Sequence, residues 1–127
     1  MHRYILQNPI FRTLPLGPLS ELLAQGREQS FAPGQALIRE GEFNHFLYVL
    51  EEGGAHIISG GKVVATIKEG EIVGEISTTG MSHPVADVVA TDAVLATAFP
   101  IELVGDLGLR YPAFAEQLRE LGTRRIY

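Results

Sequence analysis

Hydrophobic positions change their spacing twice along the chain, and these changes divide it into three segments. In residues 1–26 the apolar positions recur at helical intervals, so that Leu19, Leu22 and Leu23 share one face. Gly26 stands where a glycine commonly ends a helix. We therefore expect a helical lead-in over this segment.

The second segment, residues 27–100, has short apolar runs separated by glycine-containing turns. Its clearest strand pattern lies in residues 63–68, where Val63, Ala65 and Ile67 alternate with the intervening positions and predict one buried face. Many short strands at this spacing favour a sandwich, a jelly roll or a small barrel. We expect a mainly β fold: a β-roll of about eight short antiparallel strands with helices on both sides in sequence.

The third segment, residues 101–127, returns to helical spacing in two pieces that meet around Tyr111 and Pro112. An apolar stripe at positions i, i+4 and i+7 of the second piece is formed by Phe114, Leu118 and Leu121. This stripe can pack on the roll or on a second subunit. The C-terminal helices are therefore candidates for contact with a partner.

Length, composition and charge argue against a membrane-spanning protein and against a protein that binds nucleic acid directly. The 127 residues suit a single domain, 1–127, and contain no run long enough to span a membrane. A net charge of -5 gives no basic surface for a nucleic acid backbone, so we expect no direct nucleic acid contact. The N-terminus MHRYILQNP reaches a proline before any secretory core develops, and a cytoplasmic location is the default expectation.

Catalytic patterns are weak in this sequence, and we predict that it is not an enzyme. It has no cysteine nucleophile and no Gly-x-Ser-x-Gly elbow. Paired acids such as Glu51 and Glu52 stand near turns, where solvated side chains are expected. Three of the four histidines, His45, His56 and His83, are well separated and lack the spacing of a metal site. The alternative, a cupin-like metal enzyme, would be settled by metal analysis of the purified protein.

Several short motifs occur in an order that resembles the cyclic nucleotide-binding domain family, which includes the sensory domains of catabolite-activator-type regulators. The resemblance covers residues from Phe31 to the end of the chain. Its motifs are FAPGQALI at 31–38 with Gly41, FLYVL at 46–50 with Gly53, Gly70 with VGEIS at 73–77, and ADVVA at 86–90.

The resemblance implies a phosphate-binding cassette at 74–86 and a small anionic ligand, cyclic AMP or cyclic GMP. In the family, backbone N–H groups after the glycine contact the cyclic phosphate, and a glutamate, here Glu75, accepts a hydrogen bond from the ribose. Glu75 could instead cap the turn. The implied ligand-binding residues are Gly74, Glu75, Ile76, Ser77, Ser82, His83, Pro84, Val85 and Ala86.

One family residue is replaced. The family's cassette carries an arginine that clamps the phosphate, and the alignment of ADVVA puts Pro84 at its position. No other arginine occurs between Arg39 and Arg110. His83 and the hydroxyl groups of the cassette could compensate in part, or they could be solvated loop residues. We therefore expect weak or altered nucleotide binding.

The function that follows is a regulatory sensor domain in signal transduction, in which ligand occupancy moves the C-terminal helices. These helices would join two copies in a homodimer or attach the domain to an output domain. The alternative is a scaffold for dimerisation or interaction that binds no nucleotide.

Overall fold

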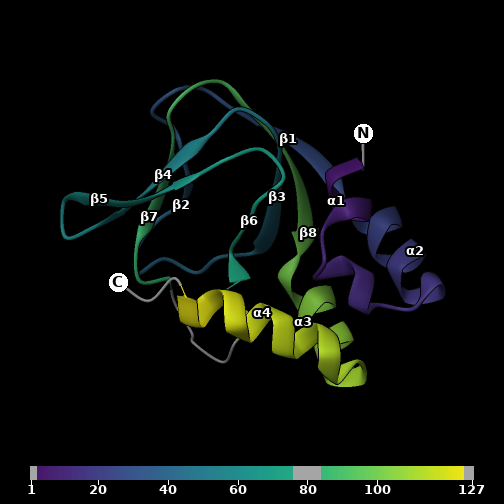
Figure 1. Cartoon of the computed structure of the whole chain (residues 1–127). Coiled ribbons are helices and arrows are strands. Elements are labelled where there is room, and N and C mark those ends of the chain that lie inside the picture. The colour runs from purple at the N-terminus through teal and green to yellow at the C-terminus, as the bar shows by residue number, and fades with distance from the viewer. Residues whose placement is uncertain (1–2, 76–83, 125–127) are drawn as a thin grey trace.

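Within residues 3–75 and 84–124, which the computed structural model describes, eight antiparallel strands form two four-stranded sheets of a β-roll (Figure 1). Helices precede and follow the roll in sequence. The N-terminal elements are α1 (Arg3–Gln7), η1 (Phe11–Thr13) and α2 (Leu16–Gln25). The strands are β1 (Arg27–Phe31), β2 (Ala36–Ile38), β3 (Phe46–Glu52), β4 (Ala55–Ser59), β5 (Lys62–Ile67), β6 (Ile72–Val73), β7 (Asp87–Ala90) and β8 (Val94–Pro100), and the C-terminal helices are α3 (Ile101–Arg110) and α4 (Pro112–Arg124).

The two sheets have the strand orders β1-β8-β3-β6 and β2-β7-β4-β5, and their facing surfaces enclose an apolar interior. Strand β8 shows how the sequence produces this arrangement. Its small residues Ala96 and Ala98 belong to the interior cluster, whereas Phe99 belongs to a second cluster outside the roll. Alternation along the strand therefore supplies apolar groups to both faces of the first sheet.

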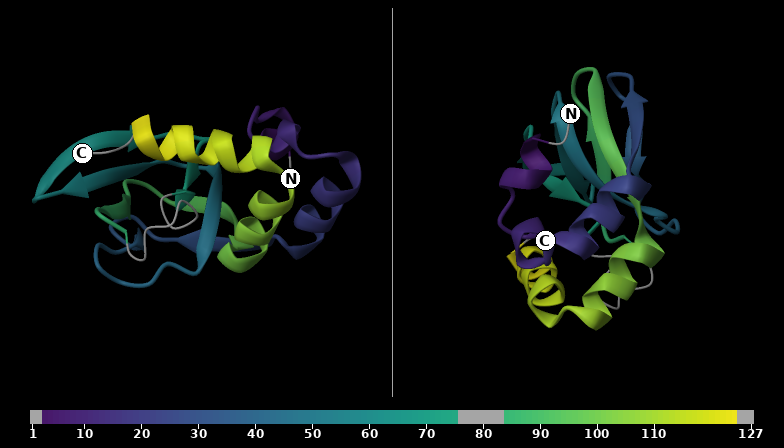
Figure 2. Two further views of the ribbon diagram at one scale, coloured as in Figure 1. Left: turned by 90° about the horizontal axis from the view of Figure 1, so that it is seen from below. Right: turned by 90° about the vertical axis from the view of Figure 1, so that its right-hand side faces the viewer.

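The second cluster lies between the first sheet and the helices. Leu47 and Val49 of β3 pack there with Phe11, Val104 and Phe114, and all five side chains are fully buried. Strand β3 is thus covered on both faces, which explains its nearly continuous apolar run. Figure 2 shows the helices gathered on one side of the molecule, with the β4–β5 hairpin extending away from them.

The helical expectations are confirmed, including the division of the C-terminal segment at Tyr111. The stripe of Phe114, Leu118 and Leu121 packs within its own chain: Phe114 and Leu118 are buried in the second cluster and Leu121 packs against it. Of the two surfaces open to the stripe, the structure thus selects the chain's own helices and first sheet. An exposed docking face would have to lie elsewhere on α4.

One local expectation about the strands is wrong, and one about the first helical segment is confirmed. Val63 is 53% exposed, because a register shift between Ile57 and Ile58 interrupts the pairing of β4 with β5 and breaks the alternating face. The expectation that Gly26 ends the helix is confirmed: α2 stops at Gln25, and Gly26 is its C-cap with φ -71° and donates its N–H to the carbonyl of Leu23. A β-carbon on Gly26 would lie 2.7 Å from Cε1 of Phe99, and the glycine is required by this close approach.

A second expectation also fails. Glu51, which the sequence placed in solvent, is buried and accepts a hydrogen bond of 2.5 Å from the hydroxyl of buried Thr97. Glu51 interrupts the register of β3 with β8, where Leu50 pairs with Ala96 and Glu52 with Leu95. The bulge turns the carboxylate onto the sheet instead of into water.

Candidate functional site

The proposed cassette is described on its two flanks, residues 74–75 and 84–86. Four of the predicted ligand-binding residues, Ile76, Ser77, Ser82 and His83, lie outside the described residues. The described part of the site consists of Gly74 and Glu75 on one side and of Pro84, Val85 and Ala86 on the other.

Gly74 follows β6 in a backbone conformation that favours glycine, with φ +99°. A β-carbon at this position would lie 2.5 Å from the carbonyl oxygen of Phe46 and 3.0 Å from Nδ2 of Asn44. The backbone of Gly74 thus packs directly on the start of β3. Asn44 fixes that start, because its amide donates to the Phe46 carbonyl over 2.8 Å.

Glu75 is the second residue of the cassette and is only 3% exposed. Burial of a carboxylate is costly unless polar groups surround it. In the described structure, access of a ligand to this carboxylate would require neighbouring groups to move. Glu75 directly follows Gly74, which packs on the start of β3 where that strand pairs with β6.

On the other flank, Pro84 is buried, and its carbonyl oxygen accepts a hydrogen bond of 3.0 Å from the backbone N–H of Gly41. Val85 is 37% exposed, whereas Ala86 belongs to the interior cluster of the roll. Asp87 then accepts a hydrogen bond of 2.7 Å from the backbone N–H of Glu40. These two bonds attach the segment that leaves the cassette to the turn after β2.

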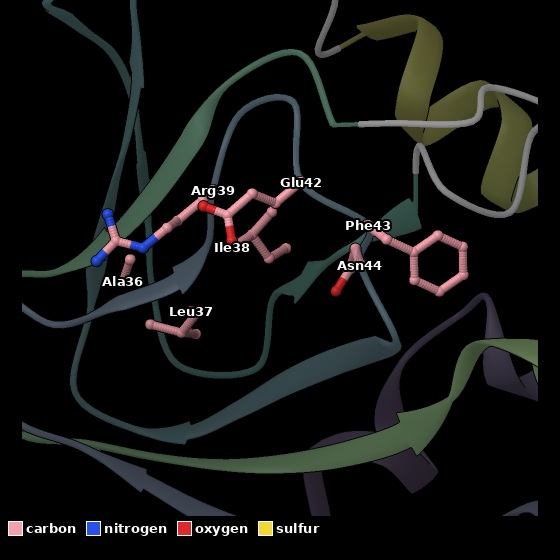
Figure 3. A pocket seen from close by; sticks show the side chains of 7 residues that line it. All are labelled: Ala36, Leu37, Ile38, Arg39, Glu42, Phe43 and Asn44. Atoms are coloured by element: carbon pink, nitrogen blue, oxygen red, sulfur yellow. The ribbon is translucent and has the colours of Figure 1, made fainter.

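That turn forms one wall of a pocket of about 220 Å³ (Figure 3). Its charged groups are Arg39 and Glu42, and the buried Asn44 lies at its far end. The ring of Phe43 points away from Arg39 in this view. Sequence reasoning missed this pocket, since only the pairing of β2 with β7 brings the turn to Pro84.

Aromatic side chains run from this turn into the roll. The Phe43 ring centroid is 4.6 Å from that of His45, and Phe46 and Tyr48 follow with centroids 5.8 Å apart. Burial raises the pKa of the Tyr48 hydroxyl above its usual range. Both residues contribute to the core, because Tyr48 belongs to the interior cluster and Phe46 packs against it.

Among the described residues, no group of three or more histidine, cysteine, aspartate or glutamate side chains has the arrangement of a metal site. None of the described helices has the length and the apolar character needed to cross a membrane.

Comparison with known proteins gives one family. The sequence model described as the cyclic nucleotide-binding domain matches residues 28–111, more than half of the chain. The regulatory subunit of a cAMP-dependent protein kinase from Hypocrea atroviridis is 32% identical over 91 residues, which make up 72% of this chain and 20% of that subunit.

Solved structures agree in fold. The regulatory subunit of a cAMP-independent protein kinase A from Trypanosoma brucei superposes with a TM-score of 0.82 at 25% identity, over 96% of this chain and 44% of that one. A variant of the trypanosome subunit, in which glutamate is replaced by alanine, threonine by arginine and valine by alanine, is bound to cAMP in its A site. That variant superposes with a TM-score of 0.72 at 24% identity, over 94% of this chain and 49% of that one.

The chain spans about a fifth of the length of the fungal subunit and less than half of the trypanosome chain. In both relatives the matching region is one part of a longer regulatory protein.

Proposed function

Because the chain belongs to the cyclic nucleotide-binding domain family, we propose that it is a regulatory sensor domain whose affinity for cyclic nucleotides is reduced by Pro84. Its ligand-binding segment would be the cassette of residues 74–86. Occupancy of the cassette would be transmitted to α3 and α4, and from there to an output domain or a second copy of the chain.

The observation that carries this proposal is the way Pro84 is held. Its burial and the hydrogen bond from Gly41 fix the backbone at the position where the resemblance expects the clamping arginine. Proline offers neither a cation nor an N–H donor to a phosphate. Loss of a buried charged partner typically costs about 2 to 5 kcal/mol, a few hundredfold in affinity at the middle of that range.

A contiguous series of contacts supports coupling to the helices. Gly74 packs on the carbonyl of Phe46, and Phe46 pairs with Pro100 at the end of β8. The next residue, Ile101, begins α3 and donates its N–H to the carbonyl of His45 over 2.9 Å. A shift of the cassette would therefore act on residues 45–46 at the start of β3, which also anchor the first turn of α3.

The burial of Glu75 favours a second candidate, a scaffold for dimerisation or interaction that binds no nucleotide. The two candidates differ in a direct measurement. Calorimetric titration with cyclic AMP, cyclic GMP and their linear monophosphates should show weak, saturable binding of a cyclic nucleotide if the domain is a sensor. Absence of binding by both cyclic nucleotides at millimolar concentration, with the chain folded, would contradict the sensor proposal and support the scaffold.

Restoring the cation tests the role of Pro84. The proposal expects Pro84→Arg to raise the affinity for cyclic AMP, and Pro84→Arg with Val85→Ala to raise it further, since the trypanosome variant bound to cAMP carries the same kinds of replacement. Pro84→Ala serves as the matched control, because it removes the ring without adding a charge. If Pro84→Arg and Pro84→Ala bind alike and both remain folded by circular dichroism, the missing clamp is not the cause of weak binding.

A further inference from the structure

The pocket beside the cassette exit combines one cation with one anion. Arg39 and Glu42 line it from the turn after β2, and both side chains are exposed. Within the described residues, the backbone carbonyl of Arg39 accepts a hydrogen bond from the N–H of Glu42, whereas its guanidinium takes part in no hydrogen bond or ion pair. Its guanidinium is therefore available to an anion from solution, as far as the described part of the chain shows.

The turn that carries this pair is held in place. The N–H of Glu40 binds Asp87, and the N–H of Gly41 binds the carbonyl of Pro84, so the turn is attached to β7 and to the cassette exit at successive residues. Asn44 closes the turn at its other end through Phe46. A site on a fixed turn loses less conformational freedom when a ligand binds.

The arrangement of charges identifies a ligand class. Guanidinium groups bind phosphate oxygens through two parallel N–H donors, and carboxylates accept hydrogen bonds from hydroxyl groups. Figure 3 shows the Glu42 carboxylate and the Arg39 side chain on the same side of the turn, opposite Phe43. A molecule with a phosphate and a nearby hydroxyl, such as a sugar phosphate, can use both groups at once.

Size limits the ligand further. The pocket measures about 220 Å³, which is below the roughly 300 to 1,000 Å³ of sites that enclose a drug-sized ligand. It can hold a pentose phosphate but would leave an attached base outside. Such a site would discriminate poorly between adenine and guanine.

We propose that Arg39 and Glu42 form a binding site for the sugar-phosphate portion of a nucleotide, in which Arg39 binds the phosphate and Glu42 accepts a hydrogen bond from a sugar hydroxyl. The inference rests on the proposed function for the nucleotide as ligand, and its cation belongs to the turn whose Gly41 N–H binds the carbonyl of Pro84. The phosphate contact is on the surface, so salt weakens it.

The test is calorimetric titration of the whole chain at low salt with ribose 5-phosphate, inorganic phosphate and cyclic AMP. Arg39→Gln should lower the affinity for ribose 5-phosphate about tenfold or more, since hydrogen bonds to charged groups are worth at least that factor. Arg39→Lys should give an intermediate value, because it keeps the charge and loses the two-pronged donor. Arg27→Gln, which removes an exposed arginine from β1 in the other sheet, should bind as the unaltered chain does.

Three results would overturn the inference: no binding of ribose 5-phosphate, equal binding by Arg39→Gln and the unaltered chain, or equal affinity for ribose 5-phosphate and inorganic phosphate. Unfolding midpoints of all variants guard against loss of the fold. If one of these three results is found while cyclic AMP still binds to Arg39→Gln, this site is refuted and the proposed function stays intact. Binding of ribose 5-phosphate through Arg39 without binding of either cyclic nucleotide would support the site and refute the proposed function.

Discussion

Replacing Gly74 by alanine separates the architectural role of this glycine from its role in the cassette. The substitution puts a β-carbon 2.5 Å from the Phe46 carbonyl oxygen and 3.3 Å from the α-carbon of Leu47. Both neighbours are backbone atoms of β3, which pairs with β6 and β8 and cannot move without disturbing those pairings. The contact can therefore be relieved only by displacing the strand or the junction after β6.

Two terms set the magnitude. A non-glycine residue at φ +99° costs on the order of 1 to 3 kcal/mol, and forcing extra volume into a packed site typically costs about 1 to 3 kcal/mol. Together they predict a loss of roughly 2 to 6 kcal/mol, a large fraction of the roughly 5 to 15 kcal/mol that holds an ordinary domain folded. At a urea slope of about 2 kcal/mol per molar, the unfolding midpoint should fall by about 1 to 3 M.

Urea unfolding followed by circular dichroism measures this loss, and Gly105→Ala is the matched control. Gly105 lies inside α3, where a β-carbon would meet nothing within 4 Å, so alanine there should stabilise the chain by about 0.5 to 1 kcal/mol. If Gly74→Ala unfolds at the same urea concentration as the unaltered chain, the reasoning is refuted. A stable Gly74→Ala that loses nucleotide binding would assign the glycine to the ligand instead of to the fold.

Three further predictions concern other buried groups. Thr97→Val removes the hydroxyl that donates to the buried Glu51 and should lower the free energy of unfolding by about 1 to 3 kcal/mol in urea titration, whereas Thr91→Val, at an exposed turn, should change it little. Phe114→Ala should lower the free energy of unfolding by about 3 to 5 kcal/mol, because the ring is fully buried beside Phe11. The control Leu109→Ser changes a residue that is 86% exposed and should alter that free energy by no more than about 0.5 kcal/mol. Equal unfolding midpoints for the two variants would contradict the packing of α4. Burial raises the pKa of Tyr48, so the folded state resists ionisation of this hydroxyl. The stability of the unaltered chain should be retained below the usual tyrosine pKa of 10.0 and should fall above it as the pH rises toward the raised value. Tyr48→Phe should therefore make unfolding midpoints less sensitive to alkaline pH.

The order of elements could be predicted from the sequence because it depends on local spacing. Helical intervals around Leu19 and Leu22 and a division at Tyr111 are properties of neighbouring residues, and the structure confirms both. The errors share a different cause. The exposure of Val63 depends on a register shift against β4, and the burial of Glu51 depends on a hydroxyl 46 residues away.

The candidate site could likewise be predicted only in part from the sequence. Gly74 and Pro84 could be selected from the sequence by resemblance, but their packing partners could not. Phe46 contacts Gly74 only because β3 pairs with β6, and Gly41 reaches Pro84 only because β2 pairs with β7. Arg39 stands 45 positions before Pro84 in the sequence, and nothing in the local pattern indicates that the turn carrying Arg39 is hydrogen-bonded to Pro84.

The packing of the cassette flanks changes what their presence in the sequence means. Gly74 is required by its contact with Phe46, and Ala86 is small and buried among the apolar residues of the roll, so both would be retained by a chain that binds no ligand. Their match to the family therefore supports the fold and is neutral about nucleotide binding. Exposed residues with few packing contacts say more about ligand binding, because the fold does not require their side chains. Arg39 and Val85 are of this kind: each is exposed, each lies at the cassette exit or on the turn attached to it, and substitution of either should alter ligand affinity with little change in stability.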